Sequence, residues 1–174
     1  MTSPSVPGTY GVASQLLAEL TARGWSLAVA ESLTGGLLTS AIVEIPGASA
    51  SLRGGVVAYD TRIKQTVLGV SRQLLDDGGP VQPEVAAQMA RGVRVALAVD
   101  GADADVGIAT TGIAGPVSPD RKPVGTVDLA VAVPGRTRTE RHVFRGDRDA
   151  IRAQAAARAL ELALETIRAC VTDR

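Results

Sequence analysis

Apolar residues recur every three or four positions in several segments of the chain, the spacing that places them on one face of an α-helix. One of these segments is followed by Gly24, a residue that favours a helix end, and another begins at Pro83, which favours a first helical turn. The pattern therefore predicts helices over residues 10–23, 37–45, 63–68, 72–76, 83–97 and 148–171.

Shorter apolar or alternating runs separate these helices and predict β-strands. The run at Gly54–Tyr59 (GGVVAY) is apolar enough to be buried on both faces of a sheet. Two later runs flank Pro134-Gly135, a dipeptide typical of a tight turn, and predict a hairpin. The predicted strands are Ser26–Ala30, Gly54–Tyr59, Asp105–Thr110, Thr126–Val133 and Thr139–Phe144.

Helices and strands alternate in the first part of the chain, and the hairpin comes late. This order predicts an α/β fold, a three-layer α/β/α single domain with a mixed sheet. We expect the domain to span residues 10–174, a length suited to one hydrophobic core. Residues 1–9, rich in Ser, Pro and Gly, are expected to form a short disordered N-terminal arm.

Composition narrows the classes of function. The formal net charge is zero, so the chain has no bulk attraction to nucleic acid or to an anionic membrane, and we expect neither DNA nor a membrane as a partner. No apolar run approaches the ~18–20 residues of a transmembrane helix. The N-terminus lacks the charged and apolar regions of a signal peptide. We therefore expect a cytoplasmic protein.

The chain contains one cysteine and one histidine. Cys170 rules out an internal disulfide and is expected to be a buried or half-buried thiol without a chemical role. His142 lies in a predicted strand, where an ordinary structural role is favoured over catalysis. A single histidine excludes a multi-histidine metal site, and we expect no metal and no cofactor.

Three polar or glycine-rich turns follow three predicted strands, at 31–36, 59–64 and 110–116. In open α/β sheets, sites form in the crevice at the carboxyl ends of the strands. If these strands are parallel neighbours, all three turns meet at one edge of the sheet.

The first turn, Glu31–Gly36, places Ser32 at or just before a helix start, where free backbone N–H groups favour negative charge. Gly35 and Gly36 allow a ligand to approach the backbone closely. The motif fits a phosphate site or an oxyanion site beside a serine nucleophile. It fits equally well a simple helix cap at Ser32 or Thr34.

A serine nucleophile requires a base, and in a chain with one histidine a lysine is the natural candidate. Lys64 in the second turn is one of only two lysines, and the other sixteen basic residues are arginines. Such a base needs a lowered pKa, from burial or from nearby cations such as Arg62 or Arg145. Tyr59 is a candidate to relay a proton or orient Lys64, with simple packing as the alternative.

The third turn opens a long loop, TGIAGPVSPDRKPVG, that contains three prolines. Thr111 and Gly112 offer a hydroxyl and free backbone amides to a polar ligand. Long loops in compact domains are usually functional or disordered, and the prolines favour function. No segment matches GxxxxGK[ST] or GxGxxG, so neither a P-loop nor a dinucleotide-binding site is predicted.

Several motifs occur in the order found in one family: AESLTGGLL, LRGGVVAYDTRIK, GPVQPEVAAQMARG, TTGIAGP, KPVGTV and FRGDRDAIR. Over residues 12–168 the chain resembles the CinA C-terminal domain family, whose similar members are nicotinamide-nucleotide amidases. It resembles a stand-alone member that lacks the N-terminal molybdopterin-binding-like domain of full CinA proteins. The resemblance implies hydrolysis of nicotinamide mononucleotide to nicotinate mononucleotide and ammonia, in pyridine-nucleotide salvage.

The resemblance also implies roles for individual residues. Ser32 is expected to attack the amide carbon, Lys64 to act as general base and acid, and Tyr59 to assist. The substrate is expected to be a pyridine mononucleotide, and no cofactor or metal is implied. We expect at least a homodimer. The predicted substrate-binding residues are Thr34, Gly35, Gly36, Thr111, Gly112 and Arg145, the last for the phosphate.

The chain departs from the family pattern at two places. Leu33 replaces the usual cysteine and is expected to pack inward. Residues 117–121 (VSPDR) replace a GGT-containing loop, a change that bears on the substrate. Two alternatives therefore stay open: an amidase for another amide, and a non-catalytic nucleotide-binding or protein-interaction module. A Ser32 Oγ to Lys64 Nζ distance of ~3–4 Å would favour an enzyme.

Overall fold

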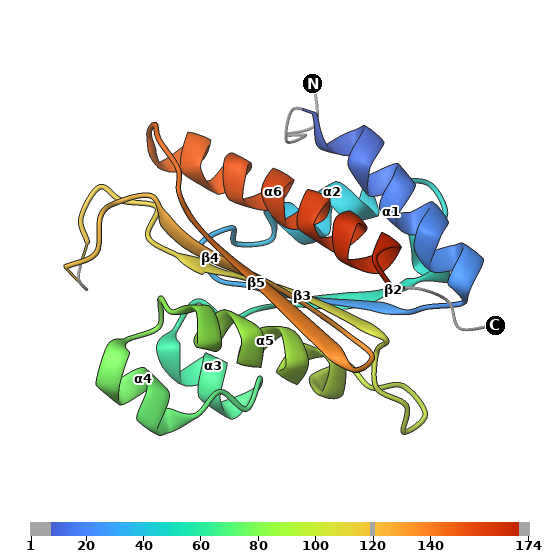
Figure 1. Cartoon of the computed structure of the whole chain (residues 1–174), viewed down its shortest axis with the longest axis horizontal. Helices are drawn as coiled ribbons and strands as arrows, with labels where there is room; N and C mark the ends of the chain where they lie inside the picture. Colours follow the sequence, from blue (N-terminus) through green and yellow to red (C-terminus); the bar gives the residue numbers. More distant parts are fainter. Residues whose placement is uncertain (1–7, 119–120, 171–174) are drawn as a thin grey trace.

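A five-stranded mixed sheet forms the middle layer of the computed structural model, which describes residues 8–118 and 121–170 (Figure 1). The strands lie in the order β2-β1-β3-β4-β5. The first three are parallel, and β3, β4 and β5 are joined in antiparallel pairs. The strands are β1 (Leu27–Glu31), β2 (Leu52–Val57), β3 (Val106–Gly112), β4 (Thr126–Val133) and β5 (Arg136–Val143).

Helices cover both faces of the sheet, which confirms the predicted three-layer α/β architecture. On one face lie α1 (Thr9–Arg23), α2 (Leu37–Val43) and α6 (Arg148–Arg168), and a short 3₁₀ helix, η1 (Ala48–Ala50), follows α2. On the other lie α3 (Thr61–Thr66), α4 (Arg72–Gly78) and α5 (Pro83–Ala96) (Figure 1).

Each helical layer packs on its own core. The layer of α1, α2 and α6 buries large aliphatic side chains, among them Leu16, Leu20 and Leu160. The layer under α5 is lined instead by alanines of the central strands. Because a Cβ on Gly107 of β3 would lie 1.9 Å from the Ala90 carbonyl of α5, this helix approaches the sheet more closely than any side chain at 107 allows.

The predicted helices are all present, with ends shifted by a few residues. The N-terminal helix begins at Thr9, so this last residue of the predicted arm is helical, and residues 1–7 of the arm lie outside the described part of the chain. The C-terminal helix ends at Arg168, whereas its predicted end was residue 171. Residue 171 lies outside the described part of the chain.

The prediction that the second strand is buried on both faces is wrong. β2 pairs only with β1 and forms an edge of the sheet, and its side chains are half-buried or exposed. Gly55 of this strand is explained by close packing against α2, because a Cβ at this position would lie 2.3 Å from Thr39 Oγ1. An apolar run alone does not distinguish a central strand from an edge strand that lies close under a helix.

The predicted hairpin at Pro134-Gly135 is confirmed, but its second strand begins at Arg136 rather than at Thr139. The pair Val133 and Arg136 closes a two-residue turn. The first residues of β5, Arg-Thr-Arg, carry no apolar signal because this edge strand exposes much of its surface.

Candidate active site

The turn after β1 is organised by a buried carboxylate. Glu31, the last residue of the strand, is completely buried and accepts hydrogen bonds from the backbone N–H groups of Gly36 (2.9 Å), Leu38 (3.1 Å) and Thr39 (2.8 Å). It also accepts one from the Thr39 hydroxyl (2.6 Å). These are the free donors of the α2 N-terminus, so Glu31 takes the place that an anionic ligand would occupy there.

Ser32 follows directly and lies beside Lys64. The Lys64 Nζ donates to Ser32 Oγ at 2.9 Å and to the backbone carbonyl of Ala58 at 2.6 Å. Ser32 is 7% exposed and Lys64 is 1% exposed. Among the described residues no carboxylate forms a salt bridge with Lys64. The amine is therefore held by two neutral acceptors in a buried position.

Burial lowers the pKa of Lys64 to about 8, and the nearby Asp60 carboxylate opposes this shift. The prediction that Arg62 helps to lower the pKa of Lys64 is wrong. The Arg62 side chain is 84% exposed and pairs with Asp60 on the surface. Desolvation of the ammonium, and not a neighbouring cation, makes the neutral amine accessible near neutral pH. Asp60 also caps α3 by accepting the Arg62 N–H, and so fixes the helix that carries Lys64.

The parallel order β2-β1-β3 brings the three turns together around one cavity of about 190 Å³. Its wall combines the serine and the lysine with apolar side chains and the backbone of the loop after β3. The lining residues are Ser32, Leu33, Tyr59, Lys64, Pro80, Val81, Thr111, Gly112, Ile113, Ala114, Gly115, Val117 and Arg148.

Five of the predicted site residues line this cavity: Ser32, Lys64, Tyr59, Thr111 and Gly112. The Thr111 hydroxyl is already engaged, since it donates to the Pro80 carbonyl at 2.8 Å. Tyr59 is 63% exposed, and its hydroxyl accepts a hydrogen bond from Arg148 (3.1 Å) and forms none with Ser32 or Lys64.

Thr34, Gly35 and Gly36 support the cavity but do not line it. The Thr34 hydroxyl lies 2.8 Å from that of Thr110, which ties the turn to β3. Gly35 and Gly36 have φ values of 58° and 100°, a left-handed conformation that side chains disfavour. These glycines therefore shape the turn, and the predicted direct contact with a ligand is not seen in the cavity wall.

Arg145, the predicted phosphate ligand, is exposed and does not line the cavity. Arg148 lines it instead and donates to the Gly115 carbonyl (2.8 Å) and the Tyr59 hydroxyl (3.1 Å). Both arginines belong to the motif FRGDR, and sequence spacing did not decide between them. The one available signal was Asp147, which caps α6 and makes Arg148 the first helical residue.

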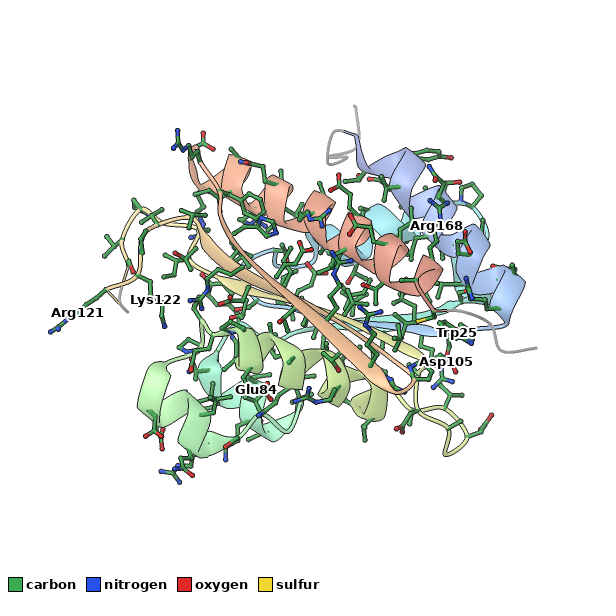
Figure 2. All side chains as sticks on the ribbon, in the orientation of Figure 1. Trp25, Glu84, Asp105, Arg121, Lys122 and Arg168 are labelled. Carbon is green, nitrogen blue, oxygen red and sulfur yellow. The ribbon has the colours of Figure 1, made fainter. Side chains whose placement is uncertain are left out.

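The loop between β3 and β4 lies over one side of the cavity. Val117 lines the cavity although it is 77% exposed, and Lys122 donates to the Gly78 carbonyl at the end of α4 (2.9 Å). Figure 2 labels Lys122 and Arg121 on this loop, at the opposite end of the molecule from Arg168. Residues 119–120 of the altered segment 117–121 lie outside the described part.

The remaining candidate groups lie elsewhere. His142 stands on β5, hydrogen-bonded to Glu140 (2.9 Å) and stacked on Phe144, outside the cavity. Leu33 is 4% exposed and packs into the core, as expected.

Within residues 8–118 and 121–170, no three His, Cys, Asp or Glu side chains form a metal-binding group. No helix in this part is long and apolar enough to cross a membrane.

A family model for the CinA C-terminal domain matches residues 9–167, nearly the whole chain. The chain belongs to the CinA family. A CinA-like protein of Frankia casuarinae is 45% identical over 160 residues, which cover 89% of this chain and 36% of that protein. A CinA-like protein of Anaeromyxobacter dehalogenans is 49% identical over 148 residues, 84% of this chain and 35% of that protein.

Solved CinA-family structures have the same fold. A CinA superfamily protein from Klebsiella pneumoniae superposes with a TM-score of 0.86 at 33% identity and covers 92% of this chain and 98% of its own. A competence/damage-inducible protein from Agrobacterium tumefaciens gives 0.85 at 32% identity, with coverages of 97% and 99%. This CinA-family chain spans about a third of the length of the curated relatives it matches.

Proposed function

We propose that this CinA-family chain is an amidase that hydrolyses the carboxamide of nicotinamide mononucleotide, giving nicotinate mononucleotide and ammonia for pyridine-nucleotide salvage. The observation that carries the proposal is the buried contact of 2.9 Å between Lys64 Nζ and Ser32 Oγ. This distance is within the ~3–4 Å that favours an enzyme, because a general base must lie within hydrogen-bond reach of its nucleophile. Burial also brings the pKa of Lys64, the proposed base, to about 8.

The chemistry follows from this pair. Neutral Lys64 accepts the Ser32 hydroxyl proton while Ser32 Oγ forms a bond to the carboxamide carbon, whose oxygen becomes an oxyanion. Collapse of this intermediate breaks the C–N bond, and the Lys64 ammonium gives its proton to the departing nitrogen, which leaves as ammonia. A water molecule, deprotonated by Lys64, then attacks the ester carbon, and the proton returns to Ser32 as the carboxylic acid product leaves.

The cavity also supports the substrate class. Apolar side chains of Val81, Ile113 and Val117 contribute to its wall and suit a planar ring. Arg148 is the one cation besides Lys64 among the lining residues, and none of the described carboxylates pairs with it. A guanidinium without an ionic partner suits a phosphate. We therefore assign the substrate phosphate to Arg148 in place of Arg145.

Ammonia release from nicotinamide mononucleotide tests the proposal. We expect activity in the wild type and losses of several orders of magnitude in Ser32→Ala and Lys64→Ala, because each removes one half of the reacting pair. Ser40→Ala, which removes an exposed hydroxyl of α2, is the matched control and should keep full activity.

Other outcomes would favour the alternatives. Wild-type release of ammonia from a different amide, but not from the mononucleotide, would assign a related amidase. Binding of the mononucleotide without any ammonia release would assign a non-catalytic nucleotide-binding module. Full activity in Ser32→Ala would contradict the serine mechanism itself.

A further inference from the structure

The wall of the cavity carries positively charged groups and no carboxylate. Lys64 and Arg148 are the charged side chains among the described residues that line it, and both are basic. The carboxylate that acts on Lys64 is Asp60, which lies outside the wall at the start of α3, is exposed and pairs with Arg62. A cation that enters this cavity therefore meets no negatively charged side chain in the described wall, and it repels an ammonium at Lys64.

The surroundings of the Lys64 amine stabilise an ammonium only weakly. Its two hydrogen-bond acceptors, Ser32 Oγ (2.9 Å) and the Ala58 carbonyl (2.6 Å), are neutral, and Lys64 is 1% exposed. The hydroxyls of Tyr59 and Thr111, the other uncharged polar side chains of the described wall, form their hydrogen bonds elsewhere. Because neither water nor a carboxylate solvates the ammonium closely, a second positive charge nearby favours loss of its proton.

The proposed substrate brings such a charge into the cavity. The bond to ribose quaternises the nicotinamide ring of the mononucleotide, so the ring carries one positive charge. For attack by Ser32, the carboxamide carbon must lie ~3–3.5 Å from an Oγ that is itself 2.9 Å from Lys64 Nζ. Because the carboxamide is bonded directly to the ring, the ring centre then lies on the order of 7 Å from Nζ. The substrate phosphate is assigned to Arg148, which offsets part of its negative charge.

We propose that the cationic ring of the substrate drives the proton off Lys64 as it binds, so that quaternary pyridinium carboxamides generate the base that activates Ser32. The ammonium proton passes to water or buffer, the lone pair stays on Nζ, and the neutral amine then accepts the Ser32 hydroxyl proton. An aromatic amide with an uncharged ring fits the same cavity but leaves the protonation of Lys64 unchanged. The inference rests on the proposed amidase function and extends it to the class of substrate.

The size of the effect follows from the separation of the charges. At an effective dielectric constant of about 20, two like charges roughly 7 Å apart lower the pKa of an ammonium by somewhat more than 1, and water at the cavity mouth reduces this to about 1. The pKa of Lys64 in the free protein is about 8. At pH 7.5 the neutral fraction of Lys64 should therefore rise from about a quarter in the free protein to about three quarters in the complex.

The pH profiles of kcat and kcat/KM test this directly, because kcat/KM titrates the free protein and kcat titrates the complex. For nicotinamide mononucleotide, the rise of kcat should lie about one pH unit below the rise of kcat/KM. The benzamide C-nucleotide 5′-phosphate keeps the carboxamide, ribose and phosphate but has an uncharged ring, and its two rises should coincide. Only the positions of the rises are compared, because the cationic ring also makes its own carboxamide more electrophilic.

Proton release on binding tests the inference without turnover, and it decides the comparison if the benzamide compound is not hydrolysed. Pyridine mononucleotide and the phenyl C-nucleotide 5′-phosphate both lack the carboxamide, and they differ in the charge of the ring. Isothermal titration calorimetry at pH 7.5, in buffers of different ionisation enthalpy, counts the protons released as each binds to the wild type. We expect about half a proton more from the pyridinium compound, since the phosphate contributes equally to both.

Two variants identify the source of the proton. Lys64→Met should abolish the difference between the two ligands, because it removes the titrating amine. Lys122→Met is the matched control and should keep the difference, since this second lysine lies outside the cavity wall and donates to the Gly78 carbonyl. If Lys64→Met fails to fold, Asp60→Asn replaces it: loss of this carboxylate lowers the pKa of Lys64 in the free protein, so the pH of greatest proton release should move down.

The outcomes separate the two proposals. A wild type that releases no ammonia from the mononucleotide, yet releases the extra half proton with pyridine mononucleotide, overturns the amidase function alone. An active wild type with coincident rises of kcat and kcat/KM, and with equal proton release for both ligands, overturns this inference alone. Failure of pyridine mononucleotide to bind also overturns it, as does an extra proton that persists in Lys64→Met, because another group would then be its source.

Discussion

The Nζ atom of Lys64 lies 2.9 Å from the Oγ atom of Ser32, although the two residues belong to different βα turns. Ser32 follows β1 and Lys64 lies on α3 after β2, and the parallel pairing of β1 with β2 brings the turns together. Burial of the amine lowers its pKa to about 8. The short distance and the lowered pKa are what the proposed serine nucleophile requires of its base.

The pH dependence of turnover should report this amine. Because only neutral Lys64 accepts the Ser32 proton, kcat/KM should rise with pH and level off above an apparent pKa of about 8. Asp60 raises the pKa of Lys64, so Asp60→Asn should shift the rise in kcat/KM to lower pH. The measurement is ammonia release between pH 6 and 10. An arginine stays protonated throughout, so Lys64→Arg should be inactive at every pH. A flat wild-type profile would show that Lys64 is not the base.

Stability should also change with pH through Lys64. The unfolded chain keeps this proton up to about 10.5, while the folded chain releases it near 8, so between these values the unfolded state binds more protons and stability rises with pH. Below pH 8 the folded state bears the full cost of a buried ammonium, on the order of 3 kcal/mol. Denaturant unfolding of the wild type and of Lys64→Met should show their difference in unfolding free energy shift in favour of the wild type from pH 8 to 10.5. A constant difference would contradict the lowered pKa.

The choice of Arg148 over Arg145 as phosphate ligand predicts a substrate-dependent effect. Arg148→Ala should lower kcat/KM for nicotinamide mononucleotide by about 10–100-fold, the loss of one charge-assisted contact, and change that for nicotinamide riboside, which lacks the phosphate, far less. Arg145→Ala is the matched control from the same motif, since its side chain lies outside the cavity wall, and it should behave as the wild type. Equal losses on both substrates would assign Arg148 to the support of Tyr59 instead.

Glu31 should be needed for folding of the nucleophile turn. Glu31→Gln replaces a buried carboxylate acceptor by an amide whose NH₂ group faces donors, and we expect a loss of about 3 kcal/mol. For a domain of this size that lowers Tm by roughly 10 °C, measured by thermal unfolding. Glu84→Gln, at an exposed pair with Arg91, should shift stability by less than about 0.5 kcal/mol. Equal Tm values for the two variants would contradict the role of Glu31.

The sequence predicted the helices, the central strands and the contact between Ser32 and Lys64, because these depend on local patterns and residue chemistry. Helical spacing located α5 and α6, and the shortage of histidine pointed to Lys64. It misplaced β2, whose apolar run belongs to an edge strand under α2. It chose Arg145 over Arg148, because which side chain of a motif faces a cavity depends on the helix start and the packing around it.

Ser32 and Arg152 show what the sequence could indicate and what only the tertiary structure shows. Ser32 could be proposed from the sequence only together with Lys64 and the family resemblance, since its motif alone fits a helix cap equally well. The hydrogen bonds of Arg152 to the carbonyls of Leu33 and Thr34 could not be foreseen, because they join segments 119 and 118 positions apart in the sequence. The sequence alone thus determined the family and most of the secondary structure, and it supplied the proposal of Ser32 as nucleophile. The tertiary structure decided which side chains meet and how deeply Lys64 is buried, because these depend on packing between distant segments.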